Sequence, residues 1–129
     1  MADKTEVSAK CDVKSIFDKS MSNGVKDAMA KTIQTAINKT SDFKFVSKTS
    51  KGFMLTVTVQ SLTKKDKPEQ LEVKITISGL YIGGTAQAFN ASGGGKADGS
   101  DADTAEDLVS QVLDSMMKNV IKTMQNLTP

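Results

Sequence analysis

Residues 90–108, NASGGGKADGSDADTAEDL, form the densest group of residues in the chain that have the chemistry to hold a charged ligand. The group contains three consecutive glycines, one lysine and four aspartates: Gly93, Gly94, Gly95, Lys96, Asp98, Asp101, Asp103 and Asp107. Glycines followed by a lysine are typical of phosphate cradles, and carboxylates are the oxygen ligands that Ca²⁺ prefers. The stretch therefore raises a phosphate hypothesis, a calcium hypothesis and a third one, in which it is a flexible link that ends in a helix cap.

The spacing of these residues argues against both ligand hypotheses. A Walker-type loop needs a glycine five positions before Gly95 and a serine or threonine after Lys96, but the chain has Asn90 and Ala97 there. The spacing of a dinucleotide fingerprint is absent too, and so are the patterns of an EF-hand loop and of a calcium-binding nonapeptide repeat. Weak cation binding by Asp98, Asp101 and Asp103 stays open, and we expect no dedicated metal site.

The link and cap explain the same residues more simply. We expect a flexible link over residues 92–102, because glycines loosen the chain, followed by the start of a long helix. Asp103 with Glu106, or Thr104 with Asp107, has the spacing of a capping box. Acidic side chains in a first turn also meet the positive end of the helix dipole.

The rest of the chain offers little to a catalyst. There is no histidine, which removes the commonest general base and metal ligand, and the only cysteine, Cys11, cannot form an internal disulfide. Cys11 alternates with Ala9 and Val13 on the apolar side of an expected strand, which predicts a buried small side chain. Lysines, aspartates and Tyr81 are not grouped. We therefore expect a protein that is not an enzyme and has no catalytic residues, no cofactor-binding residues and no metal ligands.

Hydrophobic periodicity predicts the elements that would position these residues. The expected elements are strands over residues 5–14, 43–48, 53–60, 71–78 and 85–92, and helices over residues 23–39 and 105–127. The strands over residues 53–60 and 71–78 each have one polar face, which is typical of antiparallel sheets. We expect a two-layer α+β sandwich in one domain over residues 1–129, with a mostly antiparallel five-stranded sheet, the order β-α-β-β-β-β-α and both amphipathic helices on one face. The opening strand-helix-strand unit favours two parallel neighbours.

Composition narrows the class of partner. The chain has 129 residues, of which 38% are hydrophobic and 25% charged, values typical of a soluble globular protein. All 17 basic residues are lysines, and without arginine the usual contacts to bases and phosphates are missing, so we expect no nucleic acid. No apolar run approaches the roughly 18 residues of a membrane span, so we expect no membrane insertion.

The order of elements is similar to that of a bacterial envelope domain found at the amino end of TolB and in LpoB-like and CsgG-like lipoproteins. The segments that carry the resemblance are VSAKCDV, NGVKDAMAKTIQTAINK, DFKFVSK, GFMLTVTVQSL, LEVKITISGLYIGGTAQAF and AEDLVSQVLDSMMKNVIKTM. The resemblance implies an accessory protein that acts by protein contact, lipoprotein-like and located in the periplasm or envelope if a signal segment was removed. If Met1 is the native start, the location would be cytoplasmic.

Two functions therefore remain. In the first, the chain is a non-enzymatic accessory or protein-binding module, and residues 85–92 are a candidate sheet edge for pairing with another chain. In the second, it is a small-ligand carrier with a cavity between the last helix and the sheet, lined by Met116, Met117, Phe53 and Leu55. Methionines at helical spacing fit either a packed core or an adaptable groove: Met29, Met116, Met117 and Met124. The partner protein and the oligomeric state are not predicted.

Overall fold

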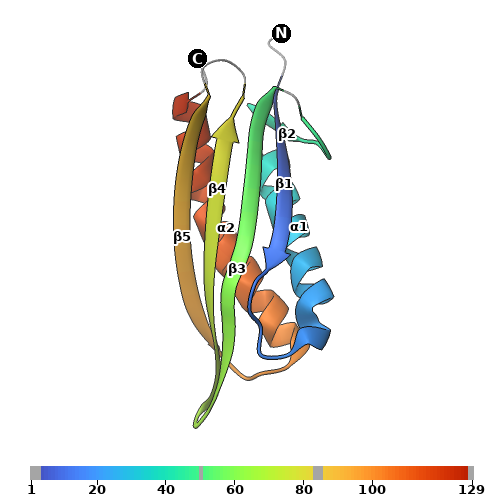
Figure 1. The fold of residues 1–129 in the computed structure, drawn as a ribbon, viewed down its shortest axis with the longest axis vertical. Helices are drawn as coiled ribbons and strands as arrows, with labels where there is room; N and C mark the ends of the chain where they lie inside the picture. Colours follow the sequence, from blue (N-terminus) through green and yellow to red (C-terminus); the bar gives the residue numbers. More distant parts are fainter. Residues whose placement is uncertain (1–3, 50, 83–85, 128–129) are drawn as a thin grey trace.

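The computed structural model describes residues 4–49, 51–82 and 86–127. In chain order the elements are β1 (Thr5–Val13), the short 3₁₀ helix η1 (Lys19–Met21), α1 (Ser22–Asn38), β2 (Phe43–Phe45), β3 (Gly52–Asp66), β4 (Glu69–Tyr81), β5 (Gln87–Asp98) and α2 (Ala102–Leu127). The five strands form one sheet, and both helices pack on the same face of it (Figure 1). The expected two-layer α+β sandwich is therefore confirmed.

The sheet is mixed: the expected antiparallel pairing is confirmed for β3, β4 and β5 and was wrong for β1. The strand order is β2-β1-β3-β4-β5, with β1 parallel to both β2 and β3, while β3, β4 and β5 are antiparallel in turn. Helix α1 carries the chain back to the end at which β1 began, so β2 runs parallel to β1, as the strand-helix-strand order suggested. The chain then enters β3 from that same end on the other side of β1, which makes a second parallel pair.

The core lies between the helices and the inner face of the sheet. Alternating residues of β1, β3 and β4 point inward, as their sequence pattern predicts, and are buried together with one stripe of each helix. Fully buried large side chains include Phe43, Phe53, Met29, Ile33, Ile37, Leu55, Leu62, Leu71, Ile75, Ile77, Leu113 and Met117. No helix of the described residues covers the other face of the sheet (Figure 1). That face carries mostly threonine, serine and charged side chains.

Strand β3 is longer than the expected segment 53–60. A bulge after Val59 shifts the alternation of inward and outward side chains by one residue, so the pattern continues beyond the expected end. The pairing with β4 shifts between Val59 and Ser61, and Leu62 then points into the core with 1% exposure. The ladder continues to the pair of Asp66 and Glu69, so the charged residues between the expected strands over 53–60 and 71–78 are mostly strand too. This hairpin extends beyond the helices at one end of the molecule (Figure 1).

The expected flexible link over residues 92–102 was wrong as well. Residues up to Asp98 belong to β5, and the three glycines pair with Val73, Lys74 and Ile75 of β4. Glycine has no side chain with which to show alternation, but its backbone donor and acceptor remain available to a ladder. Only residues 99–101 connect β5 to α2.

The cap of α2 also differs from the expectation. Oδ1 of Asp101 accepts a hydrogen bond from the backbone N–H of Thr104 at 2.7 Å, so Asp101 holds the cap position. Asp103 and Thr104, the two caps expected from the sequence, lie inside the first turn.

Candidate functional site

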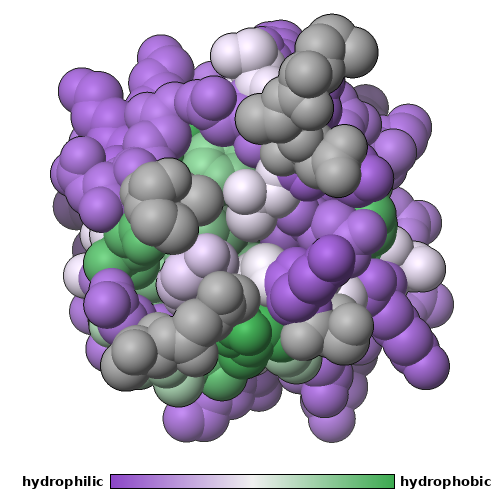
Figure 2. Space-filling view, turned by 90° about the horizontal axis from the view of Figure 1, so that it is seen from above, coloured by the Kyte–Doolittle hydropathy of each residue, from purple (hydrophilic) through white to green (hydrophobic). Residues whose placement is uncertain are grey.

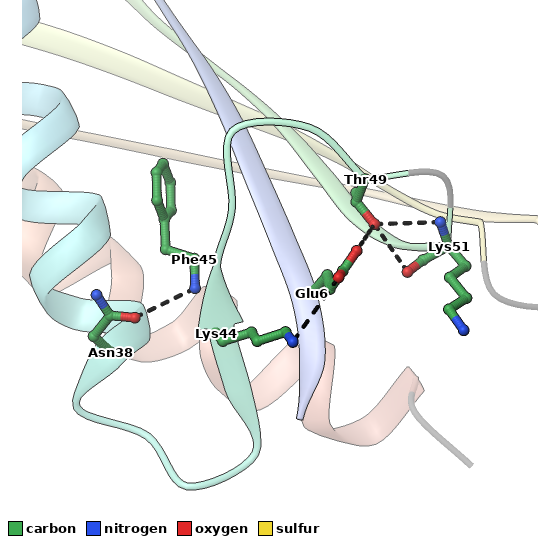
Figure 3. Close-up of polar contacts among 6 residues, drawn as sticks. All are labelled: Glu6, Asn38, Lys44, Phe45, Thr49 and Lys51. Atoms are coloured by element: carbon green, nitrogen blue, oxygen red, sulfur yellow. Dashed lines mark hydrogen bonds and ion pairs between the residues drawn. The ribbon is translucent and has the colours of Figure 1, made fainter. Parts of the chain in front are cut away.

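The two edges of the sheet differ in how their backbone groups are satisfied. At the β2 edge, the N–H of Phe43 donates to Oγ1 of Thr40 at 3.2 Å, and the N–H of Phe45 donates to Oδ1 of Asn38 at 3.3 Å. Figure 3 shows the Asn38 side chain reaching from α1 to the backbone of β2. Side chains therefore occupy the outward donors of this short edge strand, which is one way in which proteins prevent further pairing.

The β5 edge has no such cover in the part of the chain that the structure describes. Each residue from Gln87 to Asp98 has a partner in β4, with no shift of register, and β5 is the last strand of the sheet. In an antiparallel ladder only about half of the N–H and C=O groups of a strand point to one neighbour, so the other half point away from β4. None of the backbone hydrogen bonds formed outside the ladders and helices of the described residues involves residues 87–98.

The side chains of β5 do not protect this edge either. Residues 87–95 contain no proline and no charged residue, and the strand has no bulge. Charge enters only at the far end, with Lys96 and Asp98, and Nζ of Lys96 lies 3.9 Å from Oε2 of Glu72 on β4. Long, regular and uncharged edges are the ones that pair with another chain. The candidate edge expected over residues 85–92 overlaps the first half of β5, which runs from Gln87 to Asp98, while residues 83–85 lie outside the described residues.

An apolar row on the outer face leads to this edge. Met54 of β3 pairs with Leu80 of β4, and Leu80 pairs with Ala88 of β5, so their side chains share one face. Met54 is 46% exposed and Leu80 38% exposed, which makes them the exposed large hydrophobic residues of the described chain. A partner that docks along the upper part of β5 would find apolar surface beside the free backbone groups.

The upper end of β5 is anchored by an aromatic ring. Phe89 pairs with Gly79 of β4, and a Cβ built on Gly79 would lie 2.7 Å from Cε2 of Phe89 and closer still to Cζ and Cε1. The ring of Phe89 also meets that of Phe53 edge-to-face at a centroid distance of 6.2 Å, and Phe53 stacks on Tyr81 at 4.7 Å. Phe89 therefore fills the space that Gly79 leaves and holds the strand against the core.

Helix α2 lies close beneath the glycines of β5. A Cβ on Gly93 would lie 2.8 Å from Cγ of Met116, and one on Gly95 would lie 2.8 Å from Cγ2 of Val112. The glycines therefore serve close packing of strand and helix. Close packing against α2 therefore accounts for the run of glycines, and no phosphate-binding role is needed to explain it.

A polar hollow of about 410 Å³ opens at the end of the molecule where β1 and β3 begin. It is lined by Lys4, Thr5, Glu6, Lys44, Lys51, Gly52 and Tyr81. Figure 2 looks onto this end and shows mostly hydrophilic residues, with smaller hydrophobic areas between them.

Glu6, whose carboxylate lines the hollow, belongs to a cluster of polar contacts. Oγ1 of Thr49 donates to Oε1 of Glu6 at 2.9 Å and accepts from the N–H of Lys51 at 3.2 Å, and Oε2 of Glu6 lies 4.0 Å from Nζ of Lys44 (Figure 3). These contacts tie β1 and β2 to the turn that enters β3. The hollow combines lysines with one carboxylate, and the oxygens of that carboxylate already contact Thr49 and Lys44.

The acidic residues considered for a cation are spread over different elements. Asp98 ends β5, Asp101 caps α2 and Asp103 lies in the first turn of α2. Within residues 4–49, 51–82 and 86–127, no three histidine, cysteine, aspartate or glutamate side chains come together as metal ligands would. The hydrogen bond from Thr104 lowers the pKa of Asp101, as expected of a carboxylate that caps a helix.

Cys11 is half-buried and packs against the core from β1. Burial, followed by the neighbouring charge of Asp12, raises the pKa of its thiol to about 11. The thiolate is therefore scarce at neutral pH, and the residue is a packing side chain with low reactivity.

The residues expected to line a carrier cavity belong to the packed core. Phe53 and Met117 are 0% exposed, Leu55 is 2% exposed and Met116 is 6% exposed. All four belong to one cluster of buried hydrophobic residues, so these methionines act as filler between α2 and the sheet. No helix of the described residues has the length and apolarity that crossing a membrane requires.

The fold is similar to those of several solved bacterial proteins. The hypothetical protein CT253 from Chlamydia trachomatis aligns with a TM-score of 0.60 at 5% identity, over 96% of this chain and 95% of that one. The rare lipoprotein B from Shewanella oneidensis aligns with a TM-score of 0.55 at 13% identity, over 95% and 98%. A PelC dodecamer from Paraburkholderia phytofirmans gives a TM-score of 0.54 at 14% identity, over 90% and 91%.

At these identities the similarity is one of fold. No protein-family model matches the sequence, and no curated protein matches it. The chain thus shares its fold with bacterial proteins that include a lipoprotein.

Proposed function

We propose that this protein is a non-enzymatic accessory module of the bacterial cell envelope that binds a protein partner along the β5 edge. The observation that carries the proposal is the contrast between the two edges of the sheet. The outward donors of β2 are bonded to Asn38 and Thr40, whereas β5 presents twelve paired residues with a free side and no charge over residues 87–95. A partner strand that adds to β5 gains main-chain hydrogen bonds, and alternate side chains of that strand meet the apolar row or the core side.

The fold comparisons support the envelope part of the proposal. A lipoprotein shares the fold, and the order of elements resembles that of TolB amino-terminal, LpoB-like and CsgG-like domains. PelC, which has the same kind of fold, forms a dodecamer, so this architecture is compatible with assembly through its surface. A periplasmic or envelope location and a protein partner both follow from this reading.

The test is a pull-down from bacterial envelope and cytosolic fractions with the purified chain as bait. The edge variant is Ala88→Lys/Ser92→Lys, which places two lysines on the outer face of β5, the device that natural edge strands use against pairing. The matched control is Thr56→Lys, which adds a lysine to the same face on the inner strand β3, where Thr56 is exposed.

We expect a specific envelope partner that the wild type and Thr56→Lys retain and the edge variant loses. Thermal unfolding of all three proteins establishes that the variants fold. A partner that binds the edge variant as well as the wild type would show that the contact lies elsewhere. If neither fraction yields a partner, the proposal of a protein-binding module fails.

A further inference from the structure

We infer that a second copy of this chain can occupy the β5 edge, by antiparallel pairing of β5 with β5 about a two-fold axis near Ser92 and Gly93. The inference rests on the proposed function, since it names one partner for the same edge. It begins from the regularity of the strand, which is paired with β4 from Gln87 to Asp98 without interruption and therefore presents a regular, uninterrupted free side.

The alternation of side chains restricts the possible registers. Even-numbered residues of β5 lie on the exposed outer face, and odd-numbered residues lie half-buried on the inner face from Phe89 onward. Two copies keep their apolar faces on the same side only if even residues lie opposite even residues. Within β5, two such registers overlap by eleven residues, one centred on Ser92 over residues 87–97 and one centred on Gly93 over residues 88–98.

The side chains that meet in these registers are compatible. Lys96 and Asp98 are the charged residues of the strand, and neither register places like charges opposite each other. Lys96 of one copy lies opposite Asn90 of the other when the axis is at Gly93. It lies diagonally next to Asn90 when the axis is at Ser92.

The inner side of the edge offers apolar surface for the second copy to cover. Phe89, Ala91 and Ala97 are half-buried on β5, and Val112 of α2, half-buried too, lies directly beneath Gly95. Because α2 packs under β5, the pairing brings the two α2 helices towards each other beneath the joined sheets, where neighbouring helices pack at about 8–10 Å. The joined sheets would thus continue both layers of the sandwich.

Asn90 provides a charge test that depends on this arrangement. Asn90→Lys places a lysine beside Lys96 of the other copy at two symmetric positions, whereas Asn90→Glu places a carboxylate there. We expect Asn90→Lys to raise the dimer dissociation constant roughly 2- to 30-fold and Asn90→Glu to lower it. The double variant Asn90→Lys/Lys96→Glu, which restores opposite charges, should return the constant towards that of the wild type.

The experiment is sedimentation equilibrium of the full chain over micromolar to near-millimolar concentrations. Lys10→Glu is the control. It changes a charge on the same face of the sheet, but on β1, far from the β5 edge, and should leave the dimer dissociation constant unchanged. A wild type that stays monomeric throughout would overturn the inference, and so would a dimer that is indifferent to both Asn90 substitutions.

The pull-down separates failure of self-pairing from failure of the proposed function. If the chain is monomeric but Ala88→Lys/Ser92→Lys still loses an envelope partner, the edge binds a different protein and only the self-pairing fails. If the chain is monomeric and no partner depends on the edge, both proposals fail.

Discussion

The contact between Phe89 and Gly79 determines how β5 is held. It predicts that Gly79→Ala destabilises the protein when Phe89 is present and stabilises it when Phe89 is absent. Gly79→Ala adds one methyl group where the Phe89 ring already lies, since Cε2 of the ring is 2.7 Å from the position of the new Cβ and two other ring atoms are closer. Overpacking of this kind costs about 1–3 kcal/mol, while replacing glycine by alanine inside a strand otherwise contributes about 0.5–1 kcal/mol of stability. We therefore expect Gly79→Ala to lower the free energy of unfolding by roughly 0.5–2 kcal/mol.

Removing the ring should reverse this effect. In a Phe89→Ala background the space over Gly79 is open, so Gly79→Ala should raise the free energy of unfolding by about 0.5–1 kcal/mol. The coupling between the two positions is then about 1–3 kcal/mol, the range found for residues in direct contact. Urea unfolding of the four proteins of the cycle, followed by circular dichroism at 25 °C, measures it.

The m value, the slope of the unfolding free energy with urea concentration, should be the same for all four proteins, because the surface exposed on unfolding hardly changes. If Gly79→Ala stabilises the wild type, or if it has the same effect with and without Phe89, the ring does not fill the space above Gly79. The description of how β5 is anchored would then be wrong.

Three further predictions concern the turn, the thiol and the helix cap. Gly52→Ala should cost more than about 3 kcal/mol in urea unfolding, because Gly52 has a φ of 149° and a Cβ there would overlap the carbonyl oxygen of Glu6. Burial raises the pKa of Cys11 from 9.0 to about 11 and so favours the neutral thiol in the folded state; its contribution to stability is present below pH 9.0 and lost as the pH rises to about 11. The difference in unfolding free energy between the wild type and Cys11→Ala should therefore shrink over that range. The Thr104 hydrogen bond lowers the pKa of Asp101, so its contribution is present above the unfolded value of about 3.9 and lost as the pH falls through the lower folded value. Melting temperatures from pH 7 to pH 2 should show Asp101→Ala lowered by a few degrees at neutral pH and equal to the wild type in acid, with Asp101→Asn retaining most of the cap.

Side-chain periodicity made much of the fold predictable. The alternation of Phe53, Leu55 and Val57 and the three-to-four spacing along α2 depend on which side chains are buried, so the sequence carries them directly. The order of strands was harder to predict, because the direction of β3 relative to β1 depends on which end of the sheet the chain re-enters. The sequence indicated that β2 follows a crossover helix, and that pair was predicted.

Predictions from the sequence failed where backbone hydrogen bonds, and not side chains, determine the structure. Gly93 to Gly95 have no side chains, so their pairing with β4 leaves no periodic signal and the segment was expected to be a flexible link. The protection of the β2 edge by Asn38 and Thr40 has no pattern of its own either. The candidate edge was nevertheless within reach of sequence reasoning, because the residues expected to form the last strand were small and uncharged.

Amide hydrogen exchange along β5 tests most directly whether this edge is a contact surface between chains. In dilute, monomeric protein we expect the β5 amides to alternate, with those bonded to β4 protected and those on the free side exchanging quickly. At high concentration, or with the captured partner, the fast amides of residues 87–98 should become protected while the outward amides of β2 stay unchanged. If the free-side amides of β5 exchange equally fast in every complex and protection appears on another surface, β5 is not the contact surface between chains.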